Sequence, residues 1–585
     1  MRIGNISSIT TILLLYYSSI FFKGFANSFL DELNCYYFLI GLYLCLFVYL
    51  SVSLFLPVYT IALKKIDIFL LGLFTLFEIS VMTNGKVHYA EDGIVLIHAL
   101  FFLYIILRIV ICSDVVLKAL CLIILSGFIF ELIAGICDLV AVGMDKITNL
   151  DIRGTFYNSG IYIAYVLSLL PVVLPTLINL TPKWMSWLFL GTLITLILSF
   201  SIVNESRASV IAITLVLAGT YLSSKFNFKG IFLKGILFTS FLMLISVAML
   251  FKQTSSMGRW LIWQVTLNNF WHRPLLGYGP TMFSKLYPDW QAFFFMHNGS
   301  QSLIYQQLAD VTHVAFNEYL QILAETGLIG FILFVLLIWF IISLKAKPGK
   351  TRLMLGFKSM IFFYLIFAGF SYPFHILPTL FVFVCGLAAI VNMSAEDTIG
   401  LYIGRLPLRL GEIAGIIVSG YLIVWLYLYG SAVTKWKSID KIAVNDERAY
   451  GKDYEQLYPA LQLCFPYLIS YGQNLLINGN INKAITVITK ANEIYPTENG
   501  YLLLGEAYEA KKDYRQSITC YSDLASMLPA HFRPKYRLVK VYLLKSDSIK
   551  ARTLAKEIIK MPIKVPSDEI FQIKLEMKAL VYQNN

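Results

Sequence analysis

Long apolar segments, separated by short polar stretches, fill the first three quarters of the chain. A helix needs about 20 apolar residues to cross the hydrocarbon core of a bilayer. Segments that approach this length lie at residues 9–23, 36–56, 67–83, 94–112, 116–136, 160–180, 184–203, 207–222, 231–250, 327–344, 356–371, 376–392 and 412–430. The pattern predicts an all-α, polytopic membrane bundle of about twelve to thirteen spans. One or two short segments, chiefly between residues 356 and 392, are candidates for re-entrant or merged helices.

The composition agrees with this pattern. Hydrophobic residues make up 58% of the 585 residues, charged residues 14%, and the mean hydropathy is +0.70, whereas a soluble domain carries roughly 25% charged residues. The net charge of +12 comes from Lys and Arg in short loops, which favours a membrane-orientation signal over nucleic-acid binding. The eight cysteines have neither CxxC nor paired spacing, so the sequence indicates no zinc site and no disulfide framework.

The basic residues of alternate loops assign one orientation to the bundle. If the N-terminus is cytoplasmic, the cytoplasmic loops contain Lys64, Lys65, Lys118, Lys183, Lys225, Lys229, Lys345, Lys347, Lys350, Arg352, Arg405 and Arg409. The opposite loops are poorer in Lys and Arg, as the positive-inside rule requires. This orientation places the large loop (residues 251–326) on the outer face, together with Arg153 and Arg207. No convincing small-residue cleavage site follows residues 9–22, which we expect to form an uncleaved first helix.

From about Lys435 the composition becomes that of a soluble domain, which divides the chain into a membrane domain at residues 1–434 and a soluble domain at residues 435–585. The soluble part repeats every 33 to 34 residues: Gly472, Ala484, Ala491 and Pro496 recur as Gly505, Ser517, Leu524 and Pro529, and a weaker copy has Val539, Tyr542, Ala551 and Ala555. Small residues where two helices cross, followed by a proline, resemble tetratricopeptide repeats. We expect a soluble α-solenoid whose concave surface fits a peptide or a protein partner.

Four polar stretches are candidates for chemistry on the outer face. They are "RGTFYNSG" from Arg153, "NESRAS" with Arg207, "GRWLIWQVTLNNFWHRPLLGYGP" with Arg259, and "THVAFNEYLQILAETGLIG" with His313. Each feature alone has an ordinary explanation, because membrane-edge arginines contact headgroups and interfacial tryptophans form an aromatic belt. Together, three arginines and one histidine from separate segments lie on the same predicted side of the membrane.

This combination indicates an anion site beside a base. The planar guanidinium of arginine pairs with phosphate oxygens bidentately and stays charged at all working pH values. Arginines 153, 207 and 259 would hold a lipid diphosphate and stabilise the charge that grows on it as a sugar–phosphate bond breaks. A neutral His313 would take the proton from an attacking hydroxyl. Residues 313–317 are predicted to be helical, so that Asn317 shares a face with His313 and orients the imidazole or the acceptor.

In this order, the stretches resemble the O-antigen ligase superfamily, which includes lipopolysaccharide O-antigen ligases, bacterial O-linked protein oligosaccharyltransferases and O-antigen polymerases. The resemblance covers roughly residues 60–395, and "HVAFNEYLQILAETGLIG" is its most telling part. It implies a glycosyltransferase C-like membrane fold and an inverting enzyme without metal or cofactor. Carried over by motif, Arg207 and Arg259 contact the diphosphate and His313 activates the acceptor. Asn317 and Glu318 are supporting residues, and Arg153 matches a less firmly functional position.

The resemblance also implies a reaction. A preassembled glycan moves from undecaprenyl diphosphate to an acceptor hydroxyl at the periplasmic face of the bacterial inner membrane. The acceptor is lipid A core, in lipopolysaccharide biosynthesis, or a protein Ser/Thr, in protein O-glycosylation. The same chemistry would serve an O-antigen or exopolysaccharide polymerase, and that alternative stays open. The soluble domain, predicted to be periplasmic, favours a macromolecular acceptor.

Other classes of protein explain less of the sequence. A transporter or flippase would recognise the lipid diphosphate without catalysis, but transporters usually carry internal repeats and helices broken near the midplane, which this sequence lacks. A scaffold centred on the repeats leaves the arginines and His313 unexplained. The sequence also has no WWD-type signature of N-linked oligosaccharyltransferases, no Walker A loop and no DxD motif.

Overall fold

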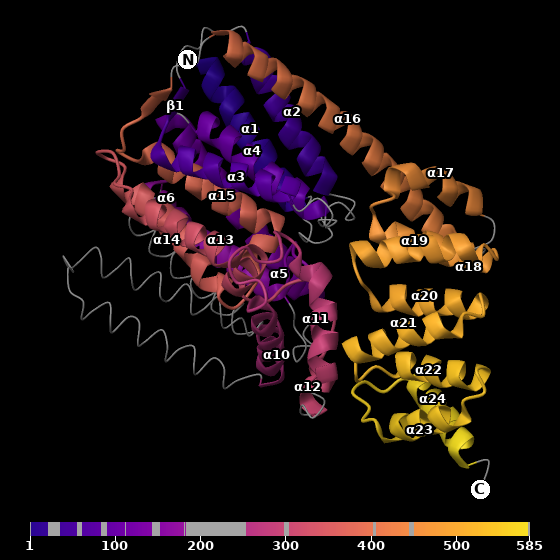
Figure 1. The fold of residues 1–585 in the computed structure, drawn as a ribbon. Helices are drawn as coiled ribbons and strands as arrows, with labels where there is room; N and C mark the ends of the chain where they lie inside the picture. Colours follow the sequence, from indigo (N-terminus) through magenta and orange to yellow (C-terminus); the bar gives the residue numbers. More distant parts are fainter. Residues whose placement is uncertain are drawn as a thin grey trace.

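Helices make up most of the chain in the computed structural model, which describes residues 2–21, 35–54, 61–83, 91–111, 113–142, 152–180, 182, 253–297, 303–401, 405–443 and 450–582 (Figure 1). The helices of the membrane part are α1 (Arg2–Phe21), α2 (Cys35–Ser53), α3 (Lys65–Thr83), α4 (Glu91–Val110), α5 (Asp114–Val142), α6 (Ser159–Leu180), α13 (Glu318–Ser343), α14 (Thr351–Ala368), η3 (Pro373–His375), α15 (Leu377–Met393) and α16 (Arg405–Ala443). The large loop contains α10 (Gln253–Phe270), α11 (Phe283–His297) and α12 (Leu303–Leu308). The C-terminal part contains α17 (Gly451–Leu461), α18 (Phe465–Ile477), α19 (Ile481–Ile494), α20 (Glu498–Ala510), α21 (Tyr514–Met527), α22 (Phe532–Leu544), α23 (Ser548–Lys560) and α24 (Asp568–Tyr582).

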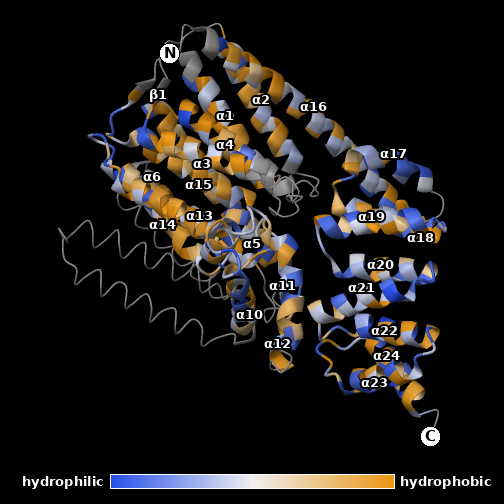
Figure 2. Cartoon of the chain, in the orientation of Figure 1, coloured by the Kyte–Doolittle hydropathy of each residue, from blue (hydrophilic) through white to orange (hydrophobic). Residues whose placement is uncertain are grey.

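The predicted spans coincide with helices wherever they fall on described residues. Among the described residues, six helical stretches are long and apolar enough to cross a membrane: Tyr36–Ser53, Asp114–Val140, Ser159–Ile178, Glu318–Ser343, Thr351–Ala368 and Arg409–Ile442. Apolar residues dominate the bundle, whereas polar and apolar residues alternate on α17–α24 (Figure 2). The chain is therefore a multi-pass membrane protein. Three predicted spans, at 184–203, 207–222 and 231–250, lie outside the described residues, so the total of twelve to thirteen stays a prediction.

Two short strands interrupt the helical pattern. β1 (Ile61–Leu63) pairs antiparallel with β2 (Ile399–Leu401), with Ile61 opposite Leu401. The ribbon joins the start of α3 to the chain that follows α15. This small addition leaves the predicted class, a helical membrane bundle, unchanged.

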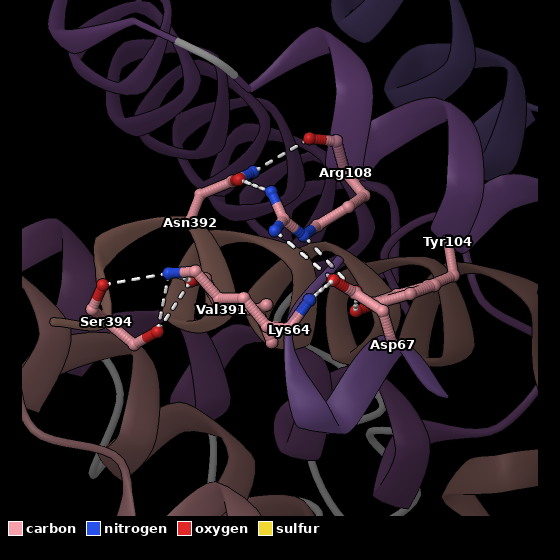
Figure 3. A network of polar contacts seen from close by, with 7 residues as sticks. All are labelled: Lys64, Asp67, Tyr104, Arg108, Val391, Asn392 and Ser394. Atoms are coloured by element: carbon pink, nitrogen blue, oxygen red, sulfur yellow. Dashed lines mark hydrogen bonds and ion pairs between the residues drawn. The ribbon is translucent and has the colours of Figure 1, made fainter. Parts of the chain in front are cut away.

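A buried lysine lies beside the ribbon (Figure 3). The Nζ atom of Lys64 donates hydrogen bonds to the carbonyl oxygens of Val391 (2.7 Å) and Ser394 (2.8 Å) and to the Ser394 hydroxyl (2.7 Å). An ammonium group that is removed from water must regain its hydrogen bonds inside the protein. Lys64 therefore ties the start of α3 to the end of α15.

Asp67 is the acidic centre of the same network (Figure 3). Its carboxylate accepts hydrogen bonds from the backbone N–H of Lys64 (2.8 Å), from the guanidinium of Arg108 (3.3 Å) and from the hydroxyl of Tyr104. Arg108 also donates to the side chain of Asn392. The side chain of Asp67 is 7% exposed, so the pair with Arg108 is largely withdrawn from water and joins α3, α4 and α15.

The helix α16 connects the bundle to the C-terminal helices (Figure 1). It is continuous for 39 residues, so the boundary that the composition predicts at residue 434 falls inside a helix. Beyond it, the hydroxyl of Tyr454 on α17 donates to Asp440 at 3.0 Å, and the rings of Trp436 and Tyr467 pack edge to face. These contacts fix the first C-terminal helices to the end of α16.

The C-terminal part is a stack of helical hairpins, which we call the repeat stack (α17–α24). The first helices of successive hairpins begin at Phe465, Glu498 and Phe532, and the second helices at Ile481, Tyr514 and Ser548. Both series advance by 33 and then 34 residues, as the sequence repeat predicts. Small residues lie where the paired helices cross, since a Cβ at Gly472 would collide with Ile488 and one at Gly505 with Tyr521. The closer resemblance to tetratricopeptide repeats stays a proposal.

The repeat stack docks on the large loop through α11 and α21. Ala292 on α11 packs among the buried side chains of Leu524, Met527 and Leu528. The side-chain amide of Gln291, itself buried, donates to the carbonyl oxygen of Met527 at 2.8 Å. The Nζ atom of Lys564 donates to the carbonyl oxygen of Gln307 at 2.8 Å. A surface from the last quarter of the chain thus covers part of the large loop.

We expect Asp67→Ala to lower the free energy of unfolding by about 3–5 kcal/mol, because it leaves the guanidinium of Arg108 buried without its carboxylate. Thermal unfolding of the protein in detergent micelles measures the change. Asp114→Ala is the matched control, since it removes an exposed carboxylate paired with Lys350, and its unfolding temperature should equal that of the wild type. Equal unfolding temperatures for both variants would contradict the assignment of Asp67 as a structural centre.

Candidate functional site

The segment before α13 is not helical, which corrects one prediction. Helix α13 begins at Glu318, and Asn317 is its N-cap: the backbone there is extended (φ −156°, ψ 103°) and the side-chain oxygen accepts from the N–H of Leu320 at 3.1 Å. Phe316 has φ +53°, which turns the chain just before the cap. The prediction that His313 and Asn317 share a helix face is therefore wrong. Asparagine favours N-caps because its side chain replaces a backbone acceptor.

The first residue of α13 forms a buried pair with His375, which is an ion pair when that histidine is protonated. Glu318 is 3% exposed, and its carboxylate accepts from the backbone N–H of Phe374 at 2.8 Å and lies 3.1 Å from Nδ1 of His375. Burial by itself lowers the pKa of His375, but the carboxylates of Glu318 and Glu325 outweigh it and raise the pKa above its ordinary value. Sequence reasoning missed His375; its one signal is the "SYPFH" turn between two apolar helices on the predicted outer face.

Gln321 connects this ion pair to the segment that carries His313. Its side-chain nitrogen lies 3.0 Å from Nε2 of His375 and 3.2 Å from the carboxylate of Glu325, and its side-chain oxygen accepts from the N–H of Ala315 at 3.1 Å. Positions 318, 321 and 325 fall on one face of a helix. The first two turns of α13 thus present a polar face inward, whereas the rest of the helix is apolar.

Glu325 and Gly327 join α13 to the loop between α10 and α11. The carboxylate of Glu325 accepts from the N–H groups of Thr281 (2.8 Å) and Phe283 (3.2 Å). At Gly327 the backbone leaves the helix (φ 66°, ψ −171°), a conformation essentially restricted to glycine. A Cβ there would also collide with the carbonyl of Leu275. The glycine is required both by its backbone angles and by this close approach.

The break at Gly327 lets two of the sequence motifs interlock. The N–H groups of Tyr278 and Gly279 donate to the carbonyl oxygens of Ala324 (3.1 Å) and Glu325 (2.9 Å), and the N–H of Leu328 donates to Pro274 (2.8 Å). "RPLLGYGP" and "ETGLIG" are therefore two sides of one backbone junction. Pro274, Gly277, Gly279 and Gly327 take part in this junction, which holds the large loop on the end of α13.

Helix α10 holds the His313 segment from another side. A guanidinium nitrogen of Arg259 donates to the carbonyl oxygen of Phe370 at 2.8 Å, and its guanidinium carbon lies 5.4 Å from the ring centroid of Phe316, a cation–π contact. One turn later, the indole N–H of Trp263 donates to the carbonyl oxygen of Ala315 at 2.9 Å. Arg259 and His313, which the sequence predicts to act together, are thus brought to the same short segment.

His313 contacts the repeat stack. The hydroxyl of Tyr495, at the end of α19, lies 3.1 Å from Nε2 of His313, and the two rings stack with centroids 4.6 Å apart and planes 8° from parallel. Burial, and to a smaller extent the nearby His375, lower the pKa of His313 to about 4. The imidazole is therefore neutral near pH 7. Nothing in the sequence near Tyr495 indicates this contact with a residue 182 positions away.

The other two arginines predicted to bind a diphosphate are Arg153 and Arg207. Arg207 lies outside the described residues. Arg153 lies in the turn between α5 and α6, where its backbone N–H and that of Gly154 donate to the carboxylate of Asp138 at 3.1 and 2.7 Å. A role for either arginine in binding a diphosphate stays a prediction. In the part of the chain that the structure covers, no three His, Cys, Asp or Glu side chains gather in a way that would hold a metal ion.

Comparison with known families gives one match, which covers most of this site. Residues 155–335 match the family model described as O-antigen ligase. The match includes Arg259, His313, Asn317 and Glu318 and ends before His375. No curated protein matches the chain. The match supports a membrane glycan transferase of the O-antigen ligase or polymerase type.

We expect Gly327→Ala to lower the free energy of unfolding by at least ~1–3 kcal/mol, the cost of a side chain at this backbone conformation. The collision with Leu275 adds to it. Thermal unfolding and limited proteolysis of the large loop measure the effect. Gly258→Ala is the control: it lies within α10 with nothing near its Cβ position, so alanine should maintain or increase stability. A Gly327→Ala protein as stable as Gly258→Ala would show that the junction is not required.

Proposed function

We propose that this protein transfers a preassembled glycan from undecaprenyl diphosphate to an acceptor hydroxyl, by an inverting reaction without metal or cofactor. The observation that carries the proposal is that Arg259 contacts Phe316, three residues after the neutral His313, inside the stretch that matches the O-antigen ligase family. A fixed cation and a neutral base, held by separate elements, are the two groups that displacement of a diphosphate by a hydroxyl requires.

In the proposed reaction, His313 takes the proton of the acceptor hydroxyl as its oxygen attacks the anomeric carbon. The bond between that carbon and the diphosphate oxygen breaks, and its electron pair leaves with undecaprenyl diphosphate. Arg259, together with Arg207, stabilises the charge that develops on the leaving group. Arg153 is a further candidate for the diphosphate. Attack from the face opposite the diphosphate inverts the anomeric configuration.

Glu318 and Asn317 support this arrangement without touching the substrates. Asn317 caps the start of α13, so residues 313–316 lie before the helix and contact α10 and the repeat stack. Glu318 holds His375, and Gln321 joins that pair to the backbone of Ala315. The orientation role that we predicted for Asn317 on a helix face is thus replaced by a capping role.

The proposed reaction also implies where the protein lies and which molecules it contacts. The protein lies in the bacterial inner membrane, and both the large loop and the repeat stack face the periplasm. The repeats are of the tetratricopeptide type and offer a surface for a protein partner. The acceptor is lipid A core or a protein Ser/Thr, and a growing glycan is the alternative, which would make the protein a polymerase.

A transfer assay with purified protein tests the reaction. The protein is incubated with a labelled undecaprenyl-diphosphate glycan, with lipid A core and with Ser/Thr-containing periplasmic proteins, and released lipid diphosphate is followed with labelled product. We expect His313→Ala to reduce turnover by about 10²–10⁴-fold and Arg259→Ala by about 10²–10³-fold. His297→Ala, an exposed histidine of the same loop, should leave turnover unchanged.

The products distinguish the alternatives. Label on lipid A core or on protein identifies a ligase or an oligosaccharyltransferase. Longer glycans without label on either acceptor identify a polymerase. Tight binding of the lipid-linked glycan without turnover, weakened by Arg259→Ala, would replace the enzyme by a transporter or a sensor.

The pH dependence of kcat/KM gives a second prediction. Burial lowers the pKa of His313 to about 4, below the ordinary value of about 6.5, so the imidazole stays unprotonated and able to accept a proton down to about pH 4. The rate should therefore be flat through pH 5–7 and fall only near pH 4. A fall centred near pH 6.5 that persists in His297→Ala would mean that the catalytic base is not buried as His313 is.

A further inference from the structure

His313 contacts the repeat stack in two ways at once, because Tyr495 both stacks on its ring and lies within hydrogen-bond distance of one ring nitrogen. Tyr495 is 6% exposed, and its ring contacts both His313 and Phe465, whose ring centroids lie 4.6 and 5.0 Å from its own. The phenol group reaches one ring nitrogen at 3.1 Å while the rings are nearly parallel. A side chain that stacks on an imidazole and also bonds its nitrogen determines the plane of that ring and its rotation within the plane.

The chain that leads to His313 is held by the same domain. Val311 packs in the cluster of Leu524, Met527 and Leu528. Gln291, which donates to Met527, also lies 3.3 Å from the carbonyl oxygen of Asp310. Two residues of these docking contacts, Asp310 and Val311, are thus close to His313 in the sequence. Docking of the repeat stack therefore holds Tyr495 against the imidazole.

We propose that Tyr495 is a positioning residue of the transfer site, so that the repeat stack is part of the catalytic unit in addition to any docking role. The phenol oxygen accepts a hydrogen bond from Nε2–H of His313, which selects the tautomer in which Nδ1 takes the proton of the acceptor hydroxyl. Nδ1 is buried in this structure, so binding of the acceptor has to open a path to it. Nε2–H stays bonded to Tyr495 throughout. When the imidazolium forms, the phenol oxygen faces its positive charge. This inference rests on the proposed role of His313 as the base.

A base oriented by a third group is the arrangement found wherever an imidazole activates a hydroxyl. Here the third group is neutral, so it orients the ring without raising its proton affinity as a carboxylate would. Among the described residues, the charged and titratable groups on the elements around His313 are His375 from η3, Tyr495 from the repeat stack and Arg259 from α10, which contacts Phe316, and Asp310 on its own segment acts on Tyr495.

Nuclear magnetic resonance of the full-length protein tests the positioning without any substrate. The chain has seven histidines, and ¹⁵N-labelled His313 is assigned by the signal lost in His313→Gln. The wild type should show the tautomer protonated on Nε2 and a pKa near 4. Tyr495→Phe keeps the stacked ring but should lose the preference for that tautomer. Tyr495→Ala uncovers the imidazole, so its pKa should rise toward the ordinary 6.5.

The transfer assay tests the consequence. Tyr495→Phe should reduce kcat by about 10–100-fold, as loss of a partner that orients a functional histidine typically does, with KM for the lipid-linked donor unchanged. In Tyr495→Ala the acid limb of kcat/KM should move upward in pH with the pKa of His313. Tyr501→Phe is the matched control, since Tyr501 packs in the docking cluster and lies on the next hairpin, and it should behave as wild type.

Two results would overturn the inference. In the first, Tyr495→Phe keeps both the wild-type tautomer and the wild-type kcat. In the second, the Tyr495 variants transfer faster than wild type, which would make the phenol group a block to the acceptor. Failure of the proposed function has a different signature: the wild type transfers no glycan, or His313→Ala transfers at the wild-type rate. The tautomer measurement still decides in that case whether Tyr495 fixes the ring.

Discussion

The pairing of Glu318 with His375 is the contact on which the arrangement of the site depends. Both side chains are buried, at 3% and 13% exposure, and a carboxylate withdrawn from water needs both a partner charge and hydrogen-bond donors. His375 and the N–H of Phe374 supply them. Because Glu318 is the first residue of α13 and His375 is the last residue of η3, the pair fixes the start of one helix against the turn that follows α14.

The polar beginning of α13 makes this pairing compatible with a helix that continues into the membrane. Glu318, Gln321 and Glu325 lie on one face and find partners inside the protein, so the helix can leave the large loop without exposing charge to lipid. Gly327 then breaks the helix at the point where the loop from α10 crosses it. The polar and the apolar halves of α13 are separated at this glycine.

The N-cap at Asn317 has a consequence for His313. Had the helix begun earlier, as the sequence suggests, residues 313–316 would have used their backbone groups within it. Instead, the carbonyl oxygen and the N–H of Ala315 bond to the side chains of Trp263 and Gln321. The segment is thus open to contact from α10 and from the repeat stack. The histidine meets Tyr495 there and is neutral because it is buried.

The local features of this protein were determined by the sequence, because their causes lie within one or two turns of chain. Apolar runs of the length of a bilayer became helices wherever they are described, and the period of 33 to 34 residues became helical hairpins with small residues at their crossings. The motifs also led to the prediction that Arg259 and His313 act together; the structure shows that Arg259 contacts Phe316, three residues from His313. Only the tertiary structure decided the contacts of Glu318 with His375 and of His313 with Tyr495. A single histidine or tyrosine carries no periodicity, and its partner lies 57 or 182 residues away, so the choice depends on how whole helices pack. Tertiary packing also overrode the predicted helix at residues 313–317, because the side chain of Asn317 caps α13 and the backbone groups of Ala315 find partners in Trp263 and Gln321.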